Sequence, residues 1–384
     1  MGGEMRKLVA APIVSLVLFI PLLSTPLYWA TPLPYPPGCS SFRQTWLHVD
    51  GKYIKDTCQQ KVFLRGTAFG DLTWRTEWQG NIADRFNQLM KLTNGKANVI
   101  RVAISPDPQF QDGSEPRTWA PGNIHPEVFD NDIDQLLSAI GQRKVYVIIE
   151  FHGGLDESEL ARIGQDPTDF VNWHLHFVNR YKNNPAVAGF ELFNEPYGPM
   201  FGGGNDDLGD QRFRDMMIVT AQAITRANPK ALILVSSGMA PGYYSQVNQY
   251  WIDHPIPGNV VYTWDYYYMN WPVDLKEPYY NGDWPAAYSG SYRNINDSIG
   301  GALRANLPVM ESEVGWYGAS APQYPQLRSE PAWQRNMNDY LGIINRLETH
   351  WSVWWWWDNP DNLGLANSGF ATLSPQGQIW SQYL

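Results

Sequence analysis

The chain has 384 residues and a formal net charge of −10, because 38 acidic residues outnumber 28 Lys and Arg. This acidic balance argues against nucleic acid and anionic membrane surfaces as partners. No glycine-rich phosphate loop follows a predicted strand, and the seven histidines show no metal-ligand spacing. We therefore expect neither a bound metal nor a cofactor.

The first 38 residues differ in composition from the rest of the chain. Arg6 and Lys7 precede the uncharged stretch 8–30, which is long enough to cross a bilayer but is interrupted by three prolines. We predict that residues 1–30 are a signal peptide or an N-terminal membrane anchor, and that residues 31–38 are a proline-rich spacer. The protein is then secreted, or tethered to the outer face of the membrane by residues 8–30.

The two cysteines of the chain, Cys39 and Cys58, bracket a hairpin-like stretch with a turn at Asp50-Gly51. A disulfide between them agrees with export, and closing this loop would stabilise the hairpin by about 3 kcal/mol. Reduced cysteines would instead indicate an intracellular location.

Apolar, β-branched runs recur along the chain, and segments with helical spacing separate them. The predicted strands are 62–67, 98–104, 145–151, 187–194, 231–236, 260–265, 308–312 and 352–357. The clearest predicted helices are 82–92, 127–140, 168–181, 210–226, 295–305 and 333–347, with none evident between the fifth and sixth strands. This alternation predicts an α/β fold, a (β/α)8 TIM barrel over residues 39–384 with an N-terminal β-hairpin cap.

Two glutamates follow strand-like runs at corresponding places. Glu195 closes the fourth predicted strand in Asn194-Glu195-Pro196, and Glu313 closes the seventh in Ser312-Glu313-Val314-Gly315. A single glutamate at such a place is usually a surface residue. Two of them at the carboxyl-end face of a barrel supply the pair of carboxyl groups that glycoside hydrolysis requires.

The Asn-Glu-Pro triplet and the Ser-Glu-Val-Gly sequence resemble glycoside hydrolase family 5, the large family of cellulases and mannanases in the retaining (β/α)8 clan. The resemblance implies that Glu195 is the acid/base and Glu313 the nucleophile. Asn194 is then placed to hydrogen-bond the 2-hydroxyl of the sugar. It also implies that the amino-terminal hairpin plugs the bottom of the barrel.

Other positions follow the family pattern residue by residue. Arg101 lies on the second strand, where the resemblance implies a contact with Glu313; a salt bridge to a scaffold carboxylate is the alternative. His152 closes the third strand, where the family has a histidine in the sugar site, although a lone histidine is often structural. Tyr267 is placed to donate its hydroxyl to Glu313.

The sixth strand departs from the pattern, because Asp265 stands where the family usually has histidine. An ionised Asp265 would repel Glu313 and raise a pKa in the pair. Three explanations stay open: Asp265 is protonated, it pairs with a base, or the predicted register is wrong by one residue.

Four consecutive tryptophans, residues 354–357, fall in the last predicted strand. The resemblance implies that one of them forms the floor under the sugar; Trp356 aligns best and Trp357 second, and core packing is expected for the others. The aromatic-rich segment 266–292 is read either as a cleft wall or as a self-packed cap. Further candidate cleft loops are 105–123, 197–208 and 358–373.

These observations predict a monomeric retaining endo-β-1,4-glucanase that acts on cellulose or a related neutral β-glucan by double displacement. An endo-β-mannanase, another β-glycan hydrolase or a transglycosylase of the same family is the alternative, because the motifs do not specify the sugar. An alternative of another class is a catalytically impaired glycan-binding barrel, which the departure at Asp265 would explain.

Overall fold

In the computed structural model the described residues are 44–73, 81–106, 122, 124–153, 155–196, 198–203, 206–236, 238, 247–267, 273–316, 330–359 and 363–384. All of them belong to the compact unit Cys39–Leu384. Within these residues no helix combines the length and the apolar character needed to cross a bilayer. The predicted signal or anchor, the spacer and Cys39 lie outside the described residues, so the Cys39–Cys58 disulfide stays a prediction.

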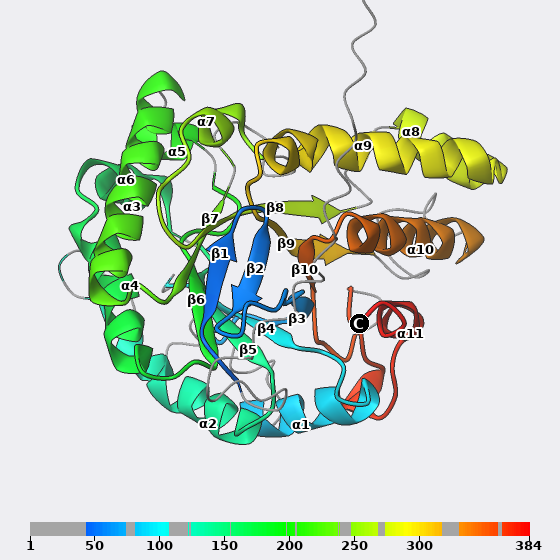
Figure 1. Cartoon of the computed structure of the whole chain (residues 1–384), viewed down its shortest axis with the longest axis horizontal. Coiled ribbons are helices and arrows are strands. Elements are labelled where there is room, and N and C mark those ends of the chain that lie inside the picture. The colour runs from blue at the N-terminus through cyan, green and yellow to red at the C-terminus, as the bar shows by residue number, and fades with distance from the viewer. Residues whose placement is uncertain are drawn as a thin grey trace, which may run out of the picture. The chain divides into compact units, whose positions relative to one another are not determined.

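Eight parallel strands close into a barrel, which confirms the predicted fold (Figure 1). The strands are β3 (Arg65–Phe69), β4 (Val99–Ile104), β5 (Tyr146–Phe151), β6 (Val187–Glu191), β7 (Leu232–Ser236), β8 (Val260–Tyr267), β9 (Val309–Gly315) and β10 (His350–Val353). They lie side by side in chain order, and β10 pairs with β3 to complete the ring. Each predicted strand overlaps one of these.

Helices surround the barrel in Figure 1, and the six predicted ones are present. The described helices are α1 (Ile82–Leu92), α2 (Asp130–Ile140), α3 (Glu157–Gln165), α4 (Thr168–Tyr181), α5 (Gly198–Gly202), α6 (Asp206–Ala227), α7 (Gln249–Asp253), α8 (Val273–Asn281), α9 (Trp284–Arg304), α10 (Glu330–Arg346) and α11 (Pro375–Trp380), with short 3-10 turns at Pro126–Phe129 and Ser368–Phe370. Between β7 and β8 the described residues form a single short helix, α7.

The described part of the aromatic-rich segment is regular secondary structure. It supplies the end of β8, the helix α8 and the start of α9. Tyr279 of α8 is buried, and its hydroxyl lies 2.6 Å from Ser291 Oγ of α9 and 3.3 Å from Asp339 of α10. The described part of the segment therefore packs against the helical layer. This favours the interpretation as a self-packed cap and disfavours the interpretation as a cleft wall.

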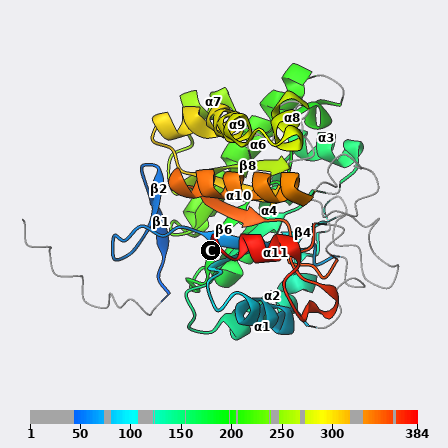
Figure 2. The same cartoon turned by 90° about the vertical axis from the view of Figure 1, so that its right-hand side faces the viewer.

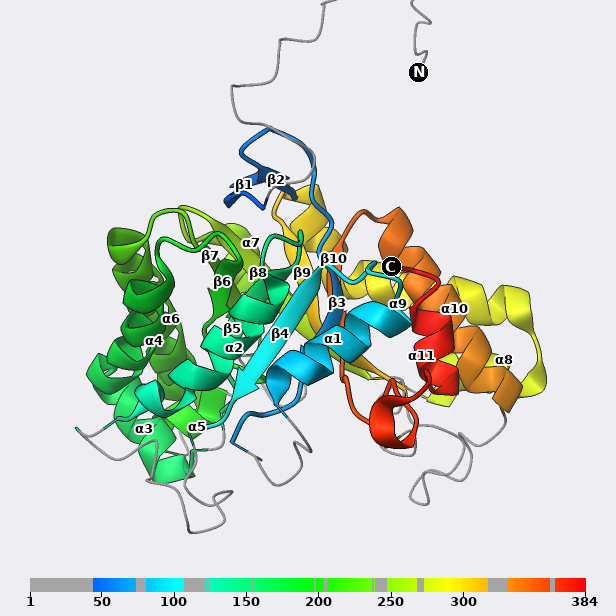
Figure 3. The same ribbon diagram turned by 90° about the horizontal axis from the view of Figure 1, so that it is seen from below.

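A two-stranded antiparallel hairpin, β1 (Leu47–Asp50) and β2 (Tyr53–Asp56), precedes the barrel as predicted. Gly51 takes the left-handed conformation that its turn requires (φ 59°). Leu47 and Ile54 are buried against residues of the barrel interior, among them Tyr146. The hairpin therefore plugs the end of the barrel at which the strands begin (Figures 2 and 3).

Two apolar layers hold the barrel together. The larger fills the space between strands and helices, where α4, for example, presents Phe170, Trp173 and Phe177 toward the sheet. The smaller lies inside the barrel beneath the site. Because both faces of the strands are covered, β4 and β5 are buried along their whole length.

Candidate active site

The site lies at the carboxyl ends of the strands, opposite the hairpin. Glu195 and Asn194 follow β6, His152 follows β5, and Glu313 lies near the end of β9. The carboxyl ends of parallel barrel strands meet at one face, which explains why residues so far apart in sequence come together.

A bulge in β9 directs Glu313 into this site. Trp264 of β8 pairs with Glu311, but the next residue, Asp265, pairs with Glu313, which leaves Ser312 as an extra residue; the pairing with β10 shows the same shift. Glu311 faces the helices and accepts a hydrogen bond from Tyr340 of α10. Simple alternation would send Glu313 to that same side, so the bulge reverses its direction.

Both oxygens of Glu313 accept hydrogen bonds. Arg101 Nη1 donates to Oε1 at 2.7 Å, which is the contact that the resemblance implied, and the Tyr267 hydroxyl donates to Oε2. His152 Nδ1 lies 4.0 Å from Oε1. Burial and the charge of Glu313 raise the pKa of Tyr267, so this hydroxyl keeps its proton and acts as a donor.

Arg101 is fully buried and contacts more carboxylates than its sequence suggested. Its Nε donates to Glu191 at 2.6 Å, and its Nη2 lies 2.9 Å from Glu150. The same Nη2 donates to Asn194 Oδ1 at 2.8 Å. Arg101 therefore makes both the salt bridges to scaffold carboxylates and the contact with Glu313. Its planar guanidinium connects these carboxylates.

Glu150 and Glu191 were missed by the sequence reasoning. A signal was present, because each is an acidic residue within an otherwise apolar, buried strand. A buried charge of this kind requires a partner. Thr263 Oγ1 of β8 also donates to Glu191, at 3.1 Å.

His152 is tied to the same network. Its Nδ1 lies 2.6 Å from Glu150 Oε1. Burial lowers the pKa of His152, but the charge of Glu150 and this hydrogen bond outweigh burial and raise the pKa to about 9. The imidazole is therefore positively charged near neutral pH and adds a second cation beside Glu313.

Glu195 occupies a different environment from Glu313. Burial and the nearby charge of Glu313 raise the pKa of Glu195 to about 8. Its backbone has a φ of 41°, in the left-handed region that a non-glycine residue adopts only where its surroundings enforce it. The environment of Glu195 therefore favours the protonated form that a general acid needs.

Asp265 faces the site, so the predicted register of the sixth strand is correct. One oxygen each of Glu195, Asp265 and Glu313 lie within 4.8 Å of one another. Among the described residues Asp265 makes no ion pair; Ser312 Oγ donates to its Oδ1 at 2.6 Å. Burial and the charge of Glu313 raise the pKa of Asp265 well above its ordinary value, which favours the protonated form over a pairing with a base.

The prediction for Trp356 was wrong. Its side chain is fully buried among the helices, with its ring 5.6 Å from Phe370 and 6.4 Å from Trp380. β10 ends at Val353, so strand alternation does not extend through the tryptophan run. The sequence could not show that the strand lies earlier than the apolar run suggested.

Trp354, Trp355 and Trp357 lie on the site side instead. Trp354 stacks on His152 with a centroid distance of 5.1 Å and an interplanar angle of 3°. Trp355 stacks between the other two tryptophans. Trp354 and Trp357 are partly exposed, so a flat aromatic surface continues outward from the histidine.

Among the described residues two groups of three side chains could each offer one atom per residue to a cation: Glu150, His152 and Glu313, or Glu195, Asp265 and Glu313. Both share Glu313, which already binds the Arg101 guanidinium. A divalent cation there would lie beside a fixed positive charge, which disfavours its binding. We therefore identify neither group as a metal site.

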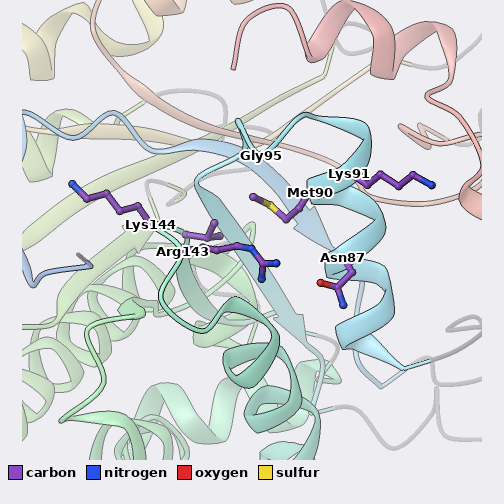
Figure 4. Close-up of a pocket in the computed structure, with 7 residues that line it drawn as sticks. Asn87, Met90, Lys91, Gly95, Arg143 and Lys144 are labelled. Carbon is purple, nitrogen blue, oxygen red and sulfur yellow. The ribbon is translucent and has the colours of Figure 1, made fainter. Parts of the chain in front are cut away.

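A separate cavity of about 550 Å³ lies near the amino ends of β4 and β5 (Figure 4). It is lined by Asn87, Met90, Lys91, Gly95, Arg143, Lys144 and Val145. Because Gly95 and Val145 precede their strands, this cavity is at the opposite end of the barrel from the glutamates and takes no part in the site.

A (β/α)8 barrel with two such glutamates at its carboxyl-end face is the arrangement of a glycoside hydrolase. The family model described as Cellulase (glycosyl hydrolase family 5) matches residues 60–360. The chain therefore belongs to glycosyl hydrolase family 5 and is a glycoside hydrolase.

Curated relatives include enzymes for two kinds of glycan. An endoglucanase from Paenibacillus polymyxa is 26% identical over 377 residues, covering 87% of this chain and 90% of the relative. A mannan endo-1,4-beta-mannosidase from Cryptopygus antarcticus is 24% identical over 211 residues, covering 46% of this chain and 54% of the relative.

Solved structures share the fold. A beta-glucanase from Saccharophagus degradans in complex with cellotetraose has a TM-score of 0.64 at 20% identity, covering 92% of this chain and 97% of the other. An endocellulase from Pyrococcus horikoshii, also with cellotetraose, has a TM-score of 0.63 at 17% identity, covering 89% and 99%.

Proposed function

We propose that this protein is a retaining endo-β-1,4-glucanase in which Glu195 is the acid/base and Glu313 the nucleophile. The short separation of the two carboxyl groups carries the proposal. One oxygen of each lies within 4.8 Å of the other, which fits the separation of about 5–5.5 Å between the carboxyl groups of a retaining enzyme. An inverting enzyme keeps its carboxyl groups about 6.5–9.5 Å apart to admit a water molecule.

In the first step, an oxygen of ionised Glu313 attacks the anomeric carbon as the bond to the leaving sugar breaks. Protonated Glu195 transfers its proton to the departing glycosidic oxygen. The products are a glycosyl ester on Glu313, a free sugar end and an ionised Glu195.

In the second step, Glu195 removes a proton from a water molecule, which attacks the anomeric carbon and breaks the ester bond. Glu313 leaves as a carboxylate, Glu195 is again protonated, and the sugar retains its configuration. A sugar hydroxyl in place of water would give transglycosylation.

The surrounding contacts support these roles. Arg101 and Tyr267 bind the two oxygens of Glu313, which stabilises its ionised form and fixes its direction. Asn194 accepts from Arg101 through its Oδ1 and so has its amide nitrogen as a donor for the 2-hydroxyl of the sugar. Trp354, held by its stack on His152, is our choice for the platform under a sugar ring.

A β-1,4-glucan is the substrate that the similarities favour. The endoglucanase relative spans nearly the whole chain, and the two neighbouring structures were solved with cellotetraose. The mannosidase relative, which matches about half of the chain, supports mannan as the second candidate.

The first test is an assay of new reducing ends with carboxymethylcellulose, glucomannan, mannan and xylan, with viscosity followed in parallel. Release from carboxymethylcellulose with a rapid fall in viscosity is the expected result. A preference for mannan would change the substrate, and longer products at high acceptor concentration would indicate transglycosylation. Binding without release on all four would favour the glycan-binding alternative and overturn the proposal.

We also propose that residues 39–384 form the catalytic domain, and that residues 1–30 export it or anchor it to the outer face of the membrane, with residues 31–38 as a spacer. The apolar character of residues 8–30 supports this. Cell fractionation of the full chain with amino-terminal sequencing of the product tests it. Activity confined to the cytoplasm would refute export and anchoring alike.

A further inference from the structure

Asp265 is buried in the site and held there by contacts with neighbouring residues. It lies opposite Glu313 in the backbone pairing of β8 and β9, and the residue is 3% exposed. Ser312, the extra residue of the bulge, donates to Asp265 Oδ1 at 2.6 Å. The bulge that directs Glu313 inward therefore also binds one oxygen of the neighbouring carboxyl group.

The charges that face Asp265 come from three other strands. Glu313 of β9 and Glu195 after β6 have oxygens within 4.8 Å of it, and the charge of Glu191 of β6 also acts on it. Among the described residues Arg101 of β4 is the cation that acts on it, but that guanidinium is already bound to Glu191 and Glu313. Within this part of the chain an ionised Asp265 would therefore place a second negative charge, without an ion-pair partner, beside the nucleophile.

Resting on the function proposed above, we propose that Asp265 is a positioning residue that stays protonated throughout turnover and donates a hydrogen bond to whichever catalytic carboxylate is ionised. In the free enzyme that carboxylate is Glu313. In the glycosyl-enzyme Glu313 is a neutral ester and Glu195 is ionised, so the hydrogen bond passes to Glu195.

This role needs only a small movement. Oxygens within 4.8 Å of one another come within hydrogen-bond distance after a shift of about 2 Å, which a rotation of the Asp265 side chain supplies. No proton enters or leaves Asp265. Together, Glu195, Asp265 and Glu313 carry one negative charge in the free enzyme and in the glycosyl-enzyme. The net charge that the surrounding residues must stabilise is therefore the same throughout turnover.

The test compares two substitutions that differ in their ability to donate. Asp265→Asn keeps a neutral donor of similar size, and Asp265→Leu removes it. We expect kcat/KM on a cello-oligosaccharide to fall by about 10-fold or less in Asp265→Asn and by on the order of 100-fold in Asp265→Leu. Glu311→Gln, which replaces a buried carboxyl group on the opposite face of β9, is the matched control and should not alter the pH profile of kcat/KM.

Infrared difference spectra supply a readout that does not depend on activity. The spectrum of the unliganded wild type minus that of Asp265→Asn should contain the carbonyl stretch of a protonated carboxylic acid near neutral pH. This band should shift when a 2-fluoro glycoside traps the glycosyl-enzyme, because the acceptor changes from Glu313 to Glu195.

The outcomes separate this inference from the function on which it rests. Equal losses in Asp265→Asn and Asp265→Leu, or a carboxylate signal in place of the acid band, would overturn the donor role while leaving the glucanase proposal intact. An acid band in a wild type that hydrolyses no glycan would refute the glucanase proposal and the role in turnover together.

Discussion

Replacing Glu195 by Gln tests the acid/base assignment most directly. With a pKa of about 8, Glu195 is about 90% protonated at pH 7, whereas at its ordinary value of 4.5 the protonated fraction would be about 0.3%. The environment of Glu195 thus increases the amount of the acid form about 300-fold. The same pKa predicts that kcat/KM of the wild type declines above about pH 8.

The assay uses two aryl cellobiosides, one with a poor leaving group and one with an activated leaving group. General acid catalysis contributes about 10²- to 10⁴-fold, so Glu195→Gln should lower kcat/KM by that factor on the poor leaving group. The activated substrate needs no protonation and should form the glycosyl-enzyme at nearly the wild-type rate. Equal losses on both substrates, or a basic decline near pH 8 that persists in the variant, would refute the assignment.

Three other changes test the rest of the network. Glu313→Gln should abolish turnover while calorimetry still detects binding of cellotetraose, and retained activity would reassign the nucleophile. Arg101→Lys should lower kcat by on the order of 100-fold, since lysine cannot bind Glu191 and Glu313 at once; circular dichroism would check that the fold persists. His174 and His350 are buried, and burial lowers the pKa of each to about 3, so the unfolded chain takes up protons first. The free energy of unfolding should therefore fall as the pH drops from 6.5 toward 3, by up to about 5 kcal/mol per histidine, and urea titrations at pH 7 and pH 4 would detect it.

The barrel was predictable because its strands are apolar runs bounded by helical segments. This pattern can be recognised even when the predicted ends of a strand are wrong by a few residues. The positions of Glu195 and Glu313 at the carboxyl-end face were predictable for the same reason, since Glu195 follows β6, Glu313 lies near the end of β9, and both strands were placed nearly correctly. Which face a side chain takes was harder to predict. The bulge at Ser312 and the early end of β10 both break alternation, and both depend on pairing between distant strands.

The network around Arg101 shows a second limit of sequence reasoning. A resemblance carries over residues that match a motif, and Glu150 and Glu191 stand outside the quoted motifs. Their role becomes visible only when the inward faces of β4, β5 and β6 are seen together. Composition and periodicity report which residues are buried, but not which buried charges meet.

The bulge in β9 makes the direction of Glu313 depend on strand register as well as on residue identity. If Ser312 paired regularly with Asp265, each later residue of β9 would move one position along β8, and the side chain of Glu313 would turn toward the helical layer. Every group that performs chemistry would still be encoded, yet the pair of carboxyl groups would no longer meet. A slip of one residue in this pairing is thus a route by which such a barrel becomes catalytically silent with its sequence unchanged.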